Sequence, residues 1–242
     1  VSSAASDVYK RQSLSLLYIN KMKNKKYEIK EQRYFSHVRH EVIDAIKDKK
    51  ELNVAEIGGG TGNTLIYLKK TGIASSIHLY DIVDFVKEKD EFDSIHIGDV
   101  ESCEFPTNKY DVIILADVLE HLFDPKKTIK RLIPSLKKEG LIICSIPNIR
   151  HFKAFYKIFI RGTFKYEDSG LFDFTHIRFF CKKDMIKLLD FPNILKRISI
   201  RSSNKFVKSK ASILDKVTFK IFSDFLTVQY IIVLKNIKTE AQ

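Results

Sequence analysis

Long apolar runs are missing from this chain of 242 residues. None approaches the roughly 18–20 consecutive apolar residues that span a bilayer, and the most hydrophobic stretch, near Val228–Leu234, has the length of a strand. The amino-terminal residues lack the basic, apolar and small-residue regions of a signal peptide. We therefore expect a cytoplasmic protein whose 44% apolar residues build one α/β domain, without internal repeats or an interdomain linker.

Cysteine is scarce as well. The three cysteines, Cys103, Cys144 and Cys181, lie far apart and form no CxxC pair. Zinc sites and disulfide scaffolds use short or paired cysteine spacings, so the sequence predicts neither of them and no metal site.

Arginine is less frequent than lysine, although the formal net charge is +12. A basic balance raises the question of nucleic-acid binding. The lysines occur as scattered doublets, however, and the interleaved aromatic and arginine residues of a nucleic-acid groove are mostly missing. We expect a generally solvated basic surface and do not expect a nucleic-acid partner.

The first residues, Val1–Gln12, do not begin with methionine, and they resemble translated adapter sequence. We treat residues 1–21 as a non-native or disordered extension and residues 22–242, from Met22, as one domain. Within it we expect a cofactor-binding core (34–147), a substrate-side insert or lid (148–181) and a carboxyl-terminal part that completes the sheet (182–242).

Apolar runs and helical periodicities alternate along the chain, a rhythm that predicts a doubly wound, mostly parallel sheet. The expected strands are Leu52–Ile57, Ser76–Tyr80, Ile95–Ile97, Asp111–Ala116, Leu141–Ile146, Leu195–Ile200 and Val228–Leu234. The expected helices are Tyr34–Lys47, Thr64–Lys70, Lys126–Lys137, Lys182–Leu189 and Ile213–Phe225.

A glycine-rich turn follows the first strand, in the sequence Glu56-Ile57-Gly58-Gly59-Gly60-Thr61-Gly62. Such a turn at the carboxyl edge of a parallel sheet marks a ligand crevice. A dinucleotide fingerprint counted from Gly58 would place Asn63 at its third glycine, which does not match. The Glu56 carboxylate would repel a pyrophosphate but suits a ligand with an ammonium and a sulfonium, so the turn favours S-adenosylmethionine over NAD.

Acidic residues close the next three strands in order: Asp81, Asp99 and Asp117. Asp81 can accept both ribose hydroxyls, and such charge-assisted hydrogen bonds contribute roughly 1.5–3 kcal/mol. Asp99 can accept the adenine amino group while the Val100 N–H meets a ring nitrogen. Asp117 would lie beside the position of methyl transfer. A single aspartate after a strand is more often a turn residue, but the ordered set favours a cofactor site.

Residues 52–147 resemble a class I S-adenosylmethionine-dependent methyltransferase core, and the likeness extends over about 34–190. Tyr110–Pro125 resembles the fourth-strand motif of ubiquinone-type and surface-polysaccharide methyltransferases, and Gly170–Phe180, GLFDFTHIRFF, a segment of methyltransferases from surface-glycan clusters. The resemblance implies a Rossmann-like, seven-stranded sheet with an antiparallel last strand and a helical, aromatic insert after the fifth strand. It implies cofactor contacts at Glu56, Gly58, Gly60, Asp81, Asp99 and Val100, to which we add Gly59, Gly62, Ile82, Ala116 and Asp117. Many relatives have Cys or Ala at the position of Gly59, a departure expected to be harmless.

Two histidines are candidates for a general base, because histidine titrates near neutral pH. His121 follows the fourth strand, where it is either catalytic or a structural helix-start residue. His176 lies near Asp173 in the segment expected to act as a lid, and Asp173 would orient its imidazole; the alternative is a polar strand residue bonded to backbone. A base of this kind contributes about 10²–10⁴ to the rate.

The loop after the fourth strand lacks the [DN]PP[YF] motif of base-amino and glutamine-amide methyltransferases, and it lacks the cysteine of cytosine-C5 enzymes. Both absences favour an O-methyltransferase, or less often a C-methyltransferase, with a small-molecule or lipid-linked acceptor. We expect a sugar in surface-glycan biosynthesis. A quinone-type or other small metabolite, an RNA, and cofactor binding without turnover stay open as alternatives.

The insert Arg150–Arg161 carries aromatic residues at helical spacing, beginning with Phe152, and a basic stripe of Lys153, Lys157 and Arg161. The aromatic face either packs on the core or meets an anionic membrane surface. The second option would make the protein peripheral at the inner membrane surface.

A chain that begins at Met22 should melt within a few degrees of the full chain, because residues 1–21 are expected to add no packing. Thermal unfolding followed by circular dichroism measures this. A large drop in melting temperature would show that these residues belong to the fold.

Overall fold

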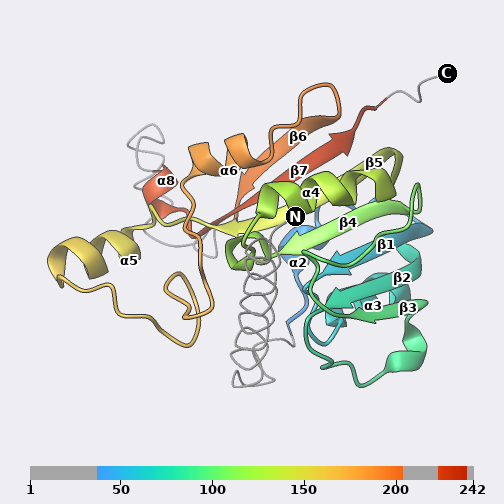
Figure 1. Cartoon of the computed structure of the whole chain (residues 1–242), viewed down its shortest axis with the longest axis horizontal. Coiled ribbons are helices and arrows are strands. Elements are labelled where there is room, and N and C mark those ends of the chain that lie inside the picture. The colour runs from blue at the N-terminus through green and yellow to red at the C-terminus, as the bar shows by residue number, and fades with distance from the viewer. Residues whose placement is uncertain (1–36, 204–222, 239–242) are drawn as a thin grey trace, which may run out of the picture.

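The computed structural model describes residues 37–203 and 223–238, which contain a seven-stranded sheet in the order β3-β2-β1-β4-β5-β7-β6 (Figure 1). β1 to β5 pair in parallel, and β7 lies antiparallel between β5 and β6. The predicted α/β class, the mostly parallel sheet and the antiparallel last strand are confirmed. The strands are β1 Leu52–Ile57, β2 Ala74–Asp81, β3 Ser94–Ile97, β4 Tyr110–Ala116, β5 Leu136–Pro147, β6 Leu195–Ser202 and β7 Gln229–Asn236.

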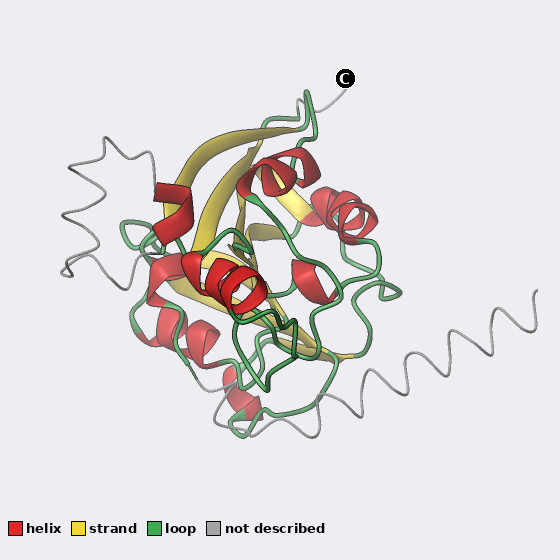
Figure 2. Ribbon diagram, turned by 90° about the vertical axis from the view of Figure 1, so that its left-hand side faces the viewer, coloured by secondary structure: helices red, strands yellow, loops and turns green. Residues whose placement is uncertain are grey.

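Helices cover both faces of this twisted sheet (Figure 2). α2 and α3 pack with one core cluster, and α4 and α6 with the other. The α-helices are α2 His40–Ile43, α3 Asn63–Lys70, α4 Pro125–Leu132, α5 Phe152–Phe155, α6 Lys182–Leu188 and α8 Ser223–Leu226. Short 3₁₀ turns lie at Lys89–Glu91, Leu119–His121 and Ile133–Ser135, and a π-helical turn at Tyr156–Ile160.

The central strand β4 is buried on both faces, as its nearly continuous apolar sequence predicts. Its side chains alternate between the two clusters: Ile113 and Leu115 pack towards α4, whereas Val112 and Ile114 pack towards α2 and α3. The strand order reverses between β1 and β4, so their following loops diverge and leave a crevice at their carboxyl ends.

Two predicted helices differ from the structure. The predicted helix Lys126–Lys137 ends at Leu132, and β5 already begins at Leu136. Pro134 explains the difference, because it has no N–H to continue an α-helix and the chain tightens into a 3₁₀ turn there. Of the predicted helix Tyr34–Lys47 the structure describes residues 37–47, and there the regular helix is α2; Val42, Ile43 and Ile46 of its apolar stripe are buried as expected. The extension 1–21 and most of the predicted helix Ile213–Phe225 lie outside the described residues.

The aromatic insert forms a lobe, defined here as residues 148–181, that projects away from the sheet at α5 (Figure 1). The sequence left two alternatives for its aromatic face, and the exposed side chains do not fit packing on the core: Tyr156 is 54% exposed and Phe159 is 71% exposed. The exposure begins before the π-helical turn at Tyr156–Ile160, since Phe152 is 38% exposed and Phe155 is 45% exposed. No described helix is both long enough and apolar enough to cross a membrane.

Candidate active site

The glycine turn between β1 and α3 has the backbone conformation that its composition predicts. Gly58, Gly60 and Gly62 have φ values of 68°, 59° and 75°, a region that other residues rarely adopt. A Cβ on Gly58 would lie only 2.7 Å from Val118 Cγ2. The turn therefore brings backbone against the loop after β4, as close ligand contact requires.

Gly59 is closely packed in this structure. A Cβ there would lie 2.5 Å from Leu79 Cδ1 and 2.9 Å from Glu56 Oε2. Both side chains are buried, so one of them has to shift to admit even alanine.

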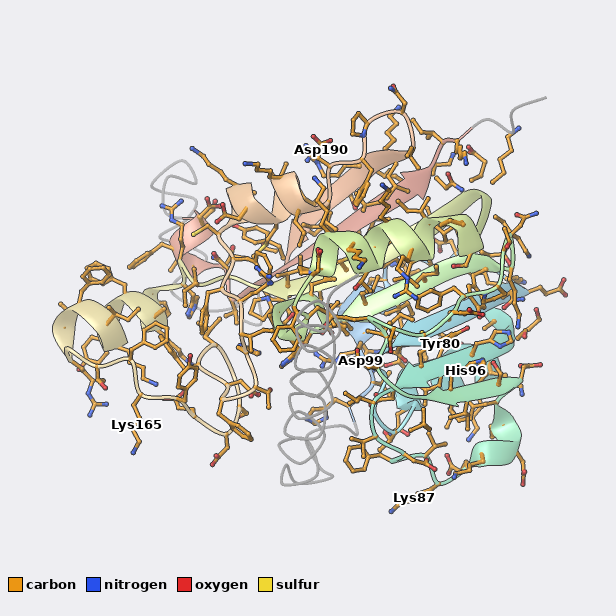
Figure 3. The ribbon with its side chains drawn as sticks, in the orientation of Figure 1. Tyr80, Lys87, His96, Asp99, Lys165 and Asp190 are labelled. Atoms are coloured by element: carbon orange, nitrogen blue, oxygen red, sulfur yellow. The ribbon has the colours of Figure 1, made fainter. Side chains whose placement is uncertain are left out.

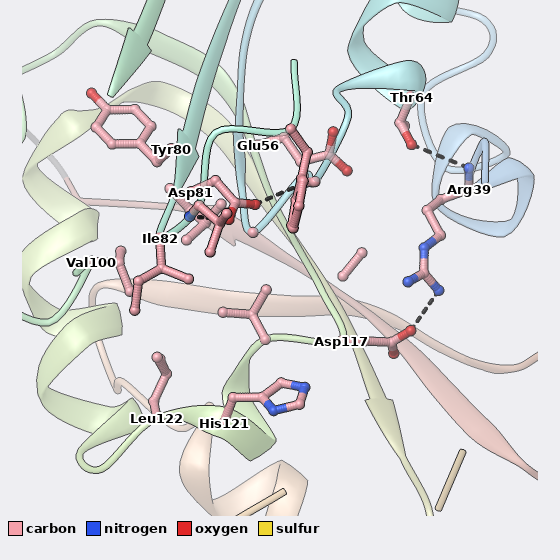
Figure 4. Close-up of a pocket in the computed structure, with 18 of the residues that line it drawn as sticks. Arg39, Glu56, Thr64, Tyr80, Asp81, Ile82, Val100, Asp117, His121 and Leu122 are labelled. Atoms are coloured by element: carbon pink, nitrogen blue, oxygen red, sulfur yellow. Dashed lines mark hydrogen bonds and ion pairs between the residues drawn. The ribbon is translucent and has the colours of Figure 1, made fainter. Parts of the chain in front are cut away.

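A pocket of about 990 Å³, including its open mouth, occupies the crevice (Figure 4). Ten of the eleven predicted cofactor-binding residues line it: Glu56, Gly58, Gly59, Gly60, Asp81, Ile82, Asp99, Val100, Ala116 and Asp117. Gly62 does not line it and instead caps α3, facing the Phe92 ring. Sequence position after parallel strands thus placed nearly all of these residues at one edge of the sheet.

Glu56 is the most electrostatically unusual residue of the pocket. It is 2% exposed, and its Oε2 has no hydrogen-bond partner. Burial raises the pKa of this carboxyl to about 8, with Arg39 opposing and Asp81 reinforcing the shift. A buried carboxylate without enough donors is stabilised by a cationic ligand.

Asp81 and Asp99 lie across the pocket from the β4 loop. Asp81 Oδ2 accepts a hydrogen bond from the Gly60 N–H at 2.8 Å, and Oδ1 accepts from the Val83 N–H. Asp99 Oδ1 accepts from the Glu101 N–H at 2.9 Å. Each carboxylate oxygen has a second lone pair, so both residues can also accept from ligand hydroxyl or amino groups.

Beside them, the Tyr80 ring forms part of the wall and stacks on His96 of β3 at a centroid distance of 4.5 Å (Figure 3). The Tyr80 hydroxyl also bonds to the Tyr110 hydroxyl at 2.7 Å. These contacts hold the Tyr80 ring rigidly beside the pocket.

Asp117 lines the pocket, but its carboxylate already has several partners. Arg39 donates to Oδ2 at 2.5 Å (Figure 4). Ser145 and Gln229 both donate to Oδ1. The residue has a φ of 57°, so this bonding holds the backbone in a left-handed conformation where the chain leaves β4. Sequence reasoning missed Arg39, because an arginine within a predicted surface helix gives no sign of an ion pair 78 residues away.

The three predicted catalytic residues are all buried, but they do not lie equally close to the pocket. His121 lines it; His176 lies behind His121, with ring centroids 4.7 Å apart, and does not line it. Asp173 Oδ1 accepts from the N–H and hydroxyl of Thr175. The short separation of the two rings still allows both histidines to act at one site.

Glu120 was missed as a site residue. It is 1% exposed, neither of its oxygens has a hydrogen-bond partner, and Oε1 lies 3.8 Å from His176 Nε2. Burial raises the pKa of this carboxyl well above its ordinary range, and the charge of Asp117 adds to the shift. The sequence signal was the pair Glu120-His121 in the loop after β4, of which only His121 was considered as a candidate base.

The pocket suits S-adenosylmethionine chemically. The orphaned Glu56 oxygen fits an ammonium, the glycine turn admits close contact, and Asp81 and Asp99 offer acceptors for hydroxyl and amino groups. An acidic lining also suits a sulfonium and disfavours a pyrophosphate.

Comparisons with known structures find proteins of the same fold. A chain from the complex between the Haloferax volcanii Trm112 methyltransferase activator and the putative methyltransferase superposes with a TM-score of 0.58 and 10% identity, over 92% of this chain and 96% of that one. A SAM-dependent methyltransferase from Archaeoglobus fulgidus superposes with a TM-score of 0.56 and 17% identity, over 81% and 90%. At these identities the likeness concerns the fold.

Sequence comparison adds a curated relative from Oryza sativa subsp. japonica, the chloroplastic 2-methyl-6-phytyl-1,4-hydroquinone methyltransferase 2. It is 30% identical over 103 residues, which are 40% of this chain and only 29% of the rice protein. The profile of a family described as "Methyltransferase domain" matches residues 27–190, about two thirds of the chain. The chain therefore belongs to the methyltransferase-domain family.

Proposed function

We propose that this protein transfers the methyl group of S-adenosylmethionine to an oxygen of a small acceptor. The observation that carries the proposal is the buried, incompletely bonded Glu56 carboxylate at the glycine turn, together with His121 in the pocket wall and the buried Glu120 carboxylate behind it. One end of the pocket thereby suits a cationic cofactor, and the other offers titratable groups for proton removal.

On the cofactor side, Glu56 accepts from the ammonium group, Asp81 from the ribose hydroxyls and Asp99 from the adenine amino group. The Val100 N–H meets an adenine ring nitrogen. Gly58 and Gly60 leave room for close backbone contact. The Arg39–Asp117 ion pair holds the loop after β4 and so maintains the width of the pocket.

When bound, S-adenosylmethionine supplies a methyl group on a sulfonium, so an oxygen–carbon bond forms as the sulfur–carbon bond breaks and sulfur keeps the electron pair. The protein has to orient the hydroxyl, and orientation can lower the barrier by roughly 7–11 kcal/mol. The hydroxyl proton leaves to the group formed by Glu120, His121 and His176, of which His121 reaches the pocket wall.

For the acceptor we propose a sugar hydroxyl of a surface glycan carried on a lipid. The support for this acceptor is the GLFDFTHIRFF segment, Gly170–Phe180, which packs on the loop after β4. The Ile177 and Arg178 N–H groups donate to Glu120 O, and Arg178 Nε donates to Leu122 O. A hydroquinone is the second candidate, favoured by the likeness to the rice protein. Both acceptors have lipid chains that hold them at a membrane.

The exposed lobe fits presentation of such an acceptor. Phe155, Tyr156, Phe159 and Ile160 are 45–71% exposed, and Lys153, Arg161 and Lys165 are exposed near them. Lys157 does not join this basic surface, since its Nζ bonds to Glu167 at 2.7 Å and lies over the Phe172 ring. Aromatic and basic side chains together bind anionic membrane surfaces.

Cofactor affinity should depend on pH through Glu56. Its carboxyl has a pKa of about 8 in the free protein, and pairing with an ammonium favours the ionised form. Affinity for S-adenosylhomocysteine should therefore rise by roughly tenfold per pH unit from about pH 5.5 to 7.5, with release of one proton. Calorimetry in buffers of different ionisation enthalpy measures both quantities.

Glu56→Gln should bind more weakly at neutral pH and lose this pH dependence, whereas the exposed Glu88→Gln serves as the matched control. A pH-independent affinity in the wild-type protein would remove Glu56 from the ammonium site.

His176→Ala should lower methyl transfer by about 10²–10⁴ while leaving cofactor affinity nearly unchanged. Transfer from labelled S-adenosylmethionine to lipid-linked sugars and to prenylated hydroquinones would be compared, with His40→Ala as a control outside the pocket. Unchanged turnover in His176→Ala would contradict its role, and transfer to hydroquinones alone would replace the sugar as acceptor.

The lobe should bind vesicles that contain anionic phospholipid. The double variant Phe159→Ser, Ile160→Ser should reduce co-sedimentation with them severalfold without loss of cofactor binding, because it removes the two most exposed apolar side chains. Ile198→Ser, which changes an exposed residue on β6, is the control. Equal binding by all three proteins would argue against membrane contact through the lobe.

A further inference from the structure

Three buried side chains, Glu120, His121 and His176, meet behind the wall of the pocket. Each offers one atom able to bind a metal ion, and these atoms all lie within 4.8 Å of one another. Two of the residues come from the turn after β4, and His176 comes from the lobe. Their relative exposures are 1%, 8% and 5%, so the group is almost closed to bulk water.

The Glu120 carboxylate is short of partners. Both oxygens are buried without a hydrogen bond, and the His176 imidazole is the nearest basic group, 3.8 Å from Oε1. Desolvating an ionised carboxylate costs several kcal/mol unless hydrogen bonds or a cation compensate. Two further carboxylates, Asp117 and Asp173, are close enough to act on Glu120 electrostatically and add negative charge.

Both histidines are oriented by backbone carbonyls. His121 Nδ1 lies 3.1 Å from Thr175 O, and His176 Nδ1 lies 3.2 Å from Leu171 O. A carbonyl oxygen only accepts, so each Nδ1 carries a proton, and Nε2 is the basic nitrogen of the neutral ring. Histidines that bind metals are typically oriented in this way by a hydrogen bond from their other ring nitrogen.

We infer that Glu120, His121 and His176 form a binding site for one divalent transition-metal ion of the zinc class. Two imidazoles and one carboxylate suit Zn²⁺, Co²⁺ or Fe²⁺, whereas Mg²⁺ and Ca²⁺ prefer oxygen ligands. Ligand atoms around a tetrahedral zinc ion lie about 3.3 Å apart. The present spacing, at most 4.8 Å, is wider, so side-chain rotation would have to accompany binding of the ion. This inference replaces the sequence-based expectation of no metal site, which considered only cysteine spacing.

The ion would have two effects. It would join the lobe, through His176, to the pocket wall, through Glu120 and His121. If the proposed methyl transfer is correct, an open coordination position would also bind the acceptor hydroxyl and lower its pKa, which replaces a free imidazole base. The binding site itself does not depend on that activity.

The full chain, stripped with EDTA and returned to metal-free buffer, would be titrated with Co²⁺ by visible absorption and with Zn²⁺ by calorimetry. We expect one ion per chain. Glu120→Gln and His176→Gln should each weaken binding by roughly tenfold or more, whereas His78→Gln, a buried histidine bonded to Ser76 and Ser94, should bind as the wild type does. Zn²⁺ should also slow deuterium exchange in residues 148–181.

S-adenosylhomocysteine binding by each protein serves as the folding control and tests the cofactor site separately. A wild-type protein that binds S-adenosylhomocysteine but neither Co²⁺ nor Zn²⁺ would overturn the inference and leave Glu120 and His176 as a buried ion pair. Equal metal binding by folded Glu120→Gln and His176→Gln would overturn it as well. If both variants fail to fold, the wild-type titration and its exchange pattern still decide, because an absent ion or an unprotected lobe contradicts the site.

Discussion

The reversal of strand order between β1 and β4 is the constraint on which the pocket depends. β1 pairs with β2 on one side and with β4 on the other, so the chain leaves the two central strands in opposite directions. The glycine turn lines the space between these loops on one side, and Val118 and Leu122 line it on the other. A Cβ at Gly58 would clash with Val118, so a glycine at this position allows the two loops to lie this close together.

The charge of the pocket is opposite to that of the molecule. The chain has a formal net charge of +12, yet four acidic residues, Glu56, Asp81, Asp99 and Asp117, line the crevice. Glu56 and Glu120 are buried with too few donors, which is costly for the protein alone. Such groups are tolerated where a ligand supplies the missing charge, and both lie where a cationic partner is proposed: the cofactor ammonium at Glu56 and a metal ion at Glu120.

The lobe is connected to the loop after β4 by backbone as well as by side-chain hydrogen bonds. Glu120 O accepts from two successive N–H groups of the lobe, and His121 Nδ1 donates to Thr175 O. Movement of the lobe would therefore also move Glu120 and His121. The same lobe carries the exposed aromatic residues.

Local signals in the sequence predicted the strands, the parallel pairing of the core and most of the residues at the edge of the pocket. Period and apolar runs located every strand to within a few residues, and an aspartate directly after a parallel strand has to lie at its carboxyl end. The carboxyl-terminal end of α4 was missed, because Pro134 ends the helix earlier than the apolar period suggests. The surroundings of the aromatic stripe were left open, because helical spacing alone does not say what a helix face contacts.

The ion pairs and contacts between side chains distant in sequence depend on tertiary packing. Arg39 and Asp117 are 78 residues apart, and His121 and His176 are 55 residues apart. The lack of hydrogen-bond partners at Glu120 also depends on what packs around it. No local pattern specifies them, because they depend on how the lobe and α2 pack against the loop after β4. The sequence therefore determined which chemical groups reach the edge of the sheet, and the packing decided which of them act together.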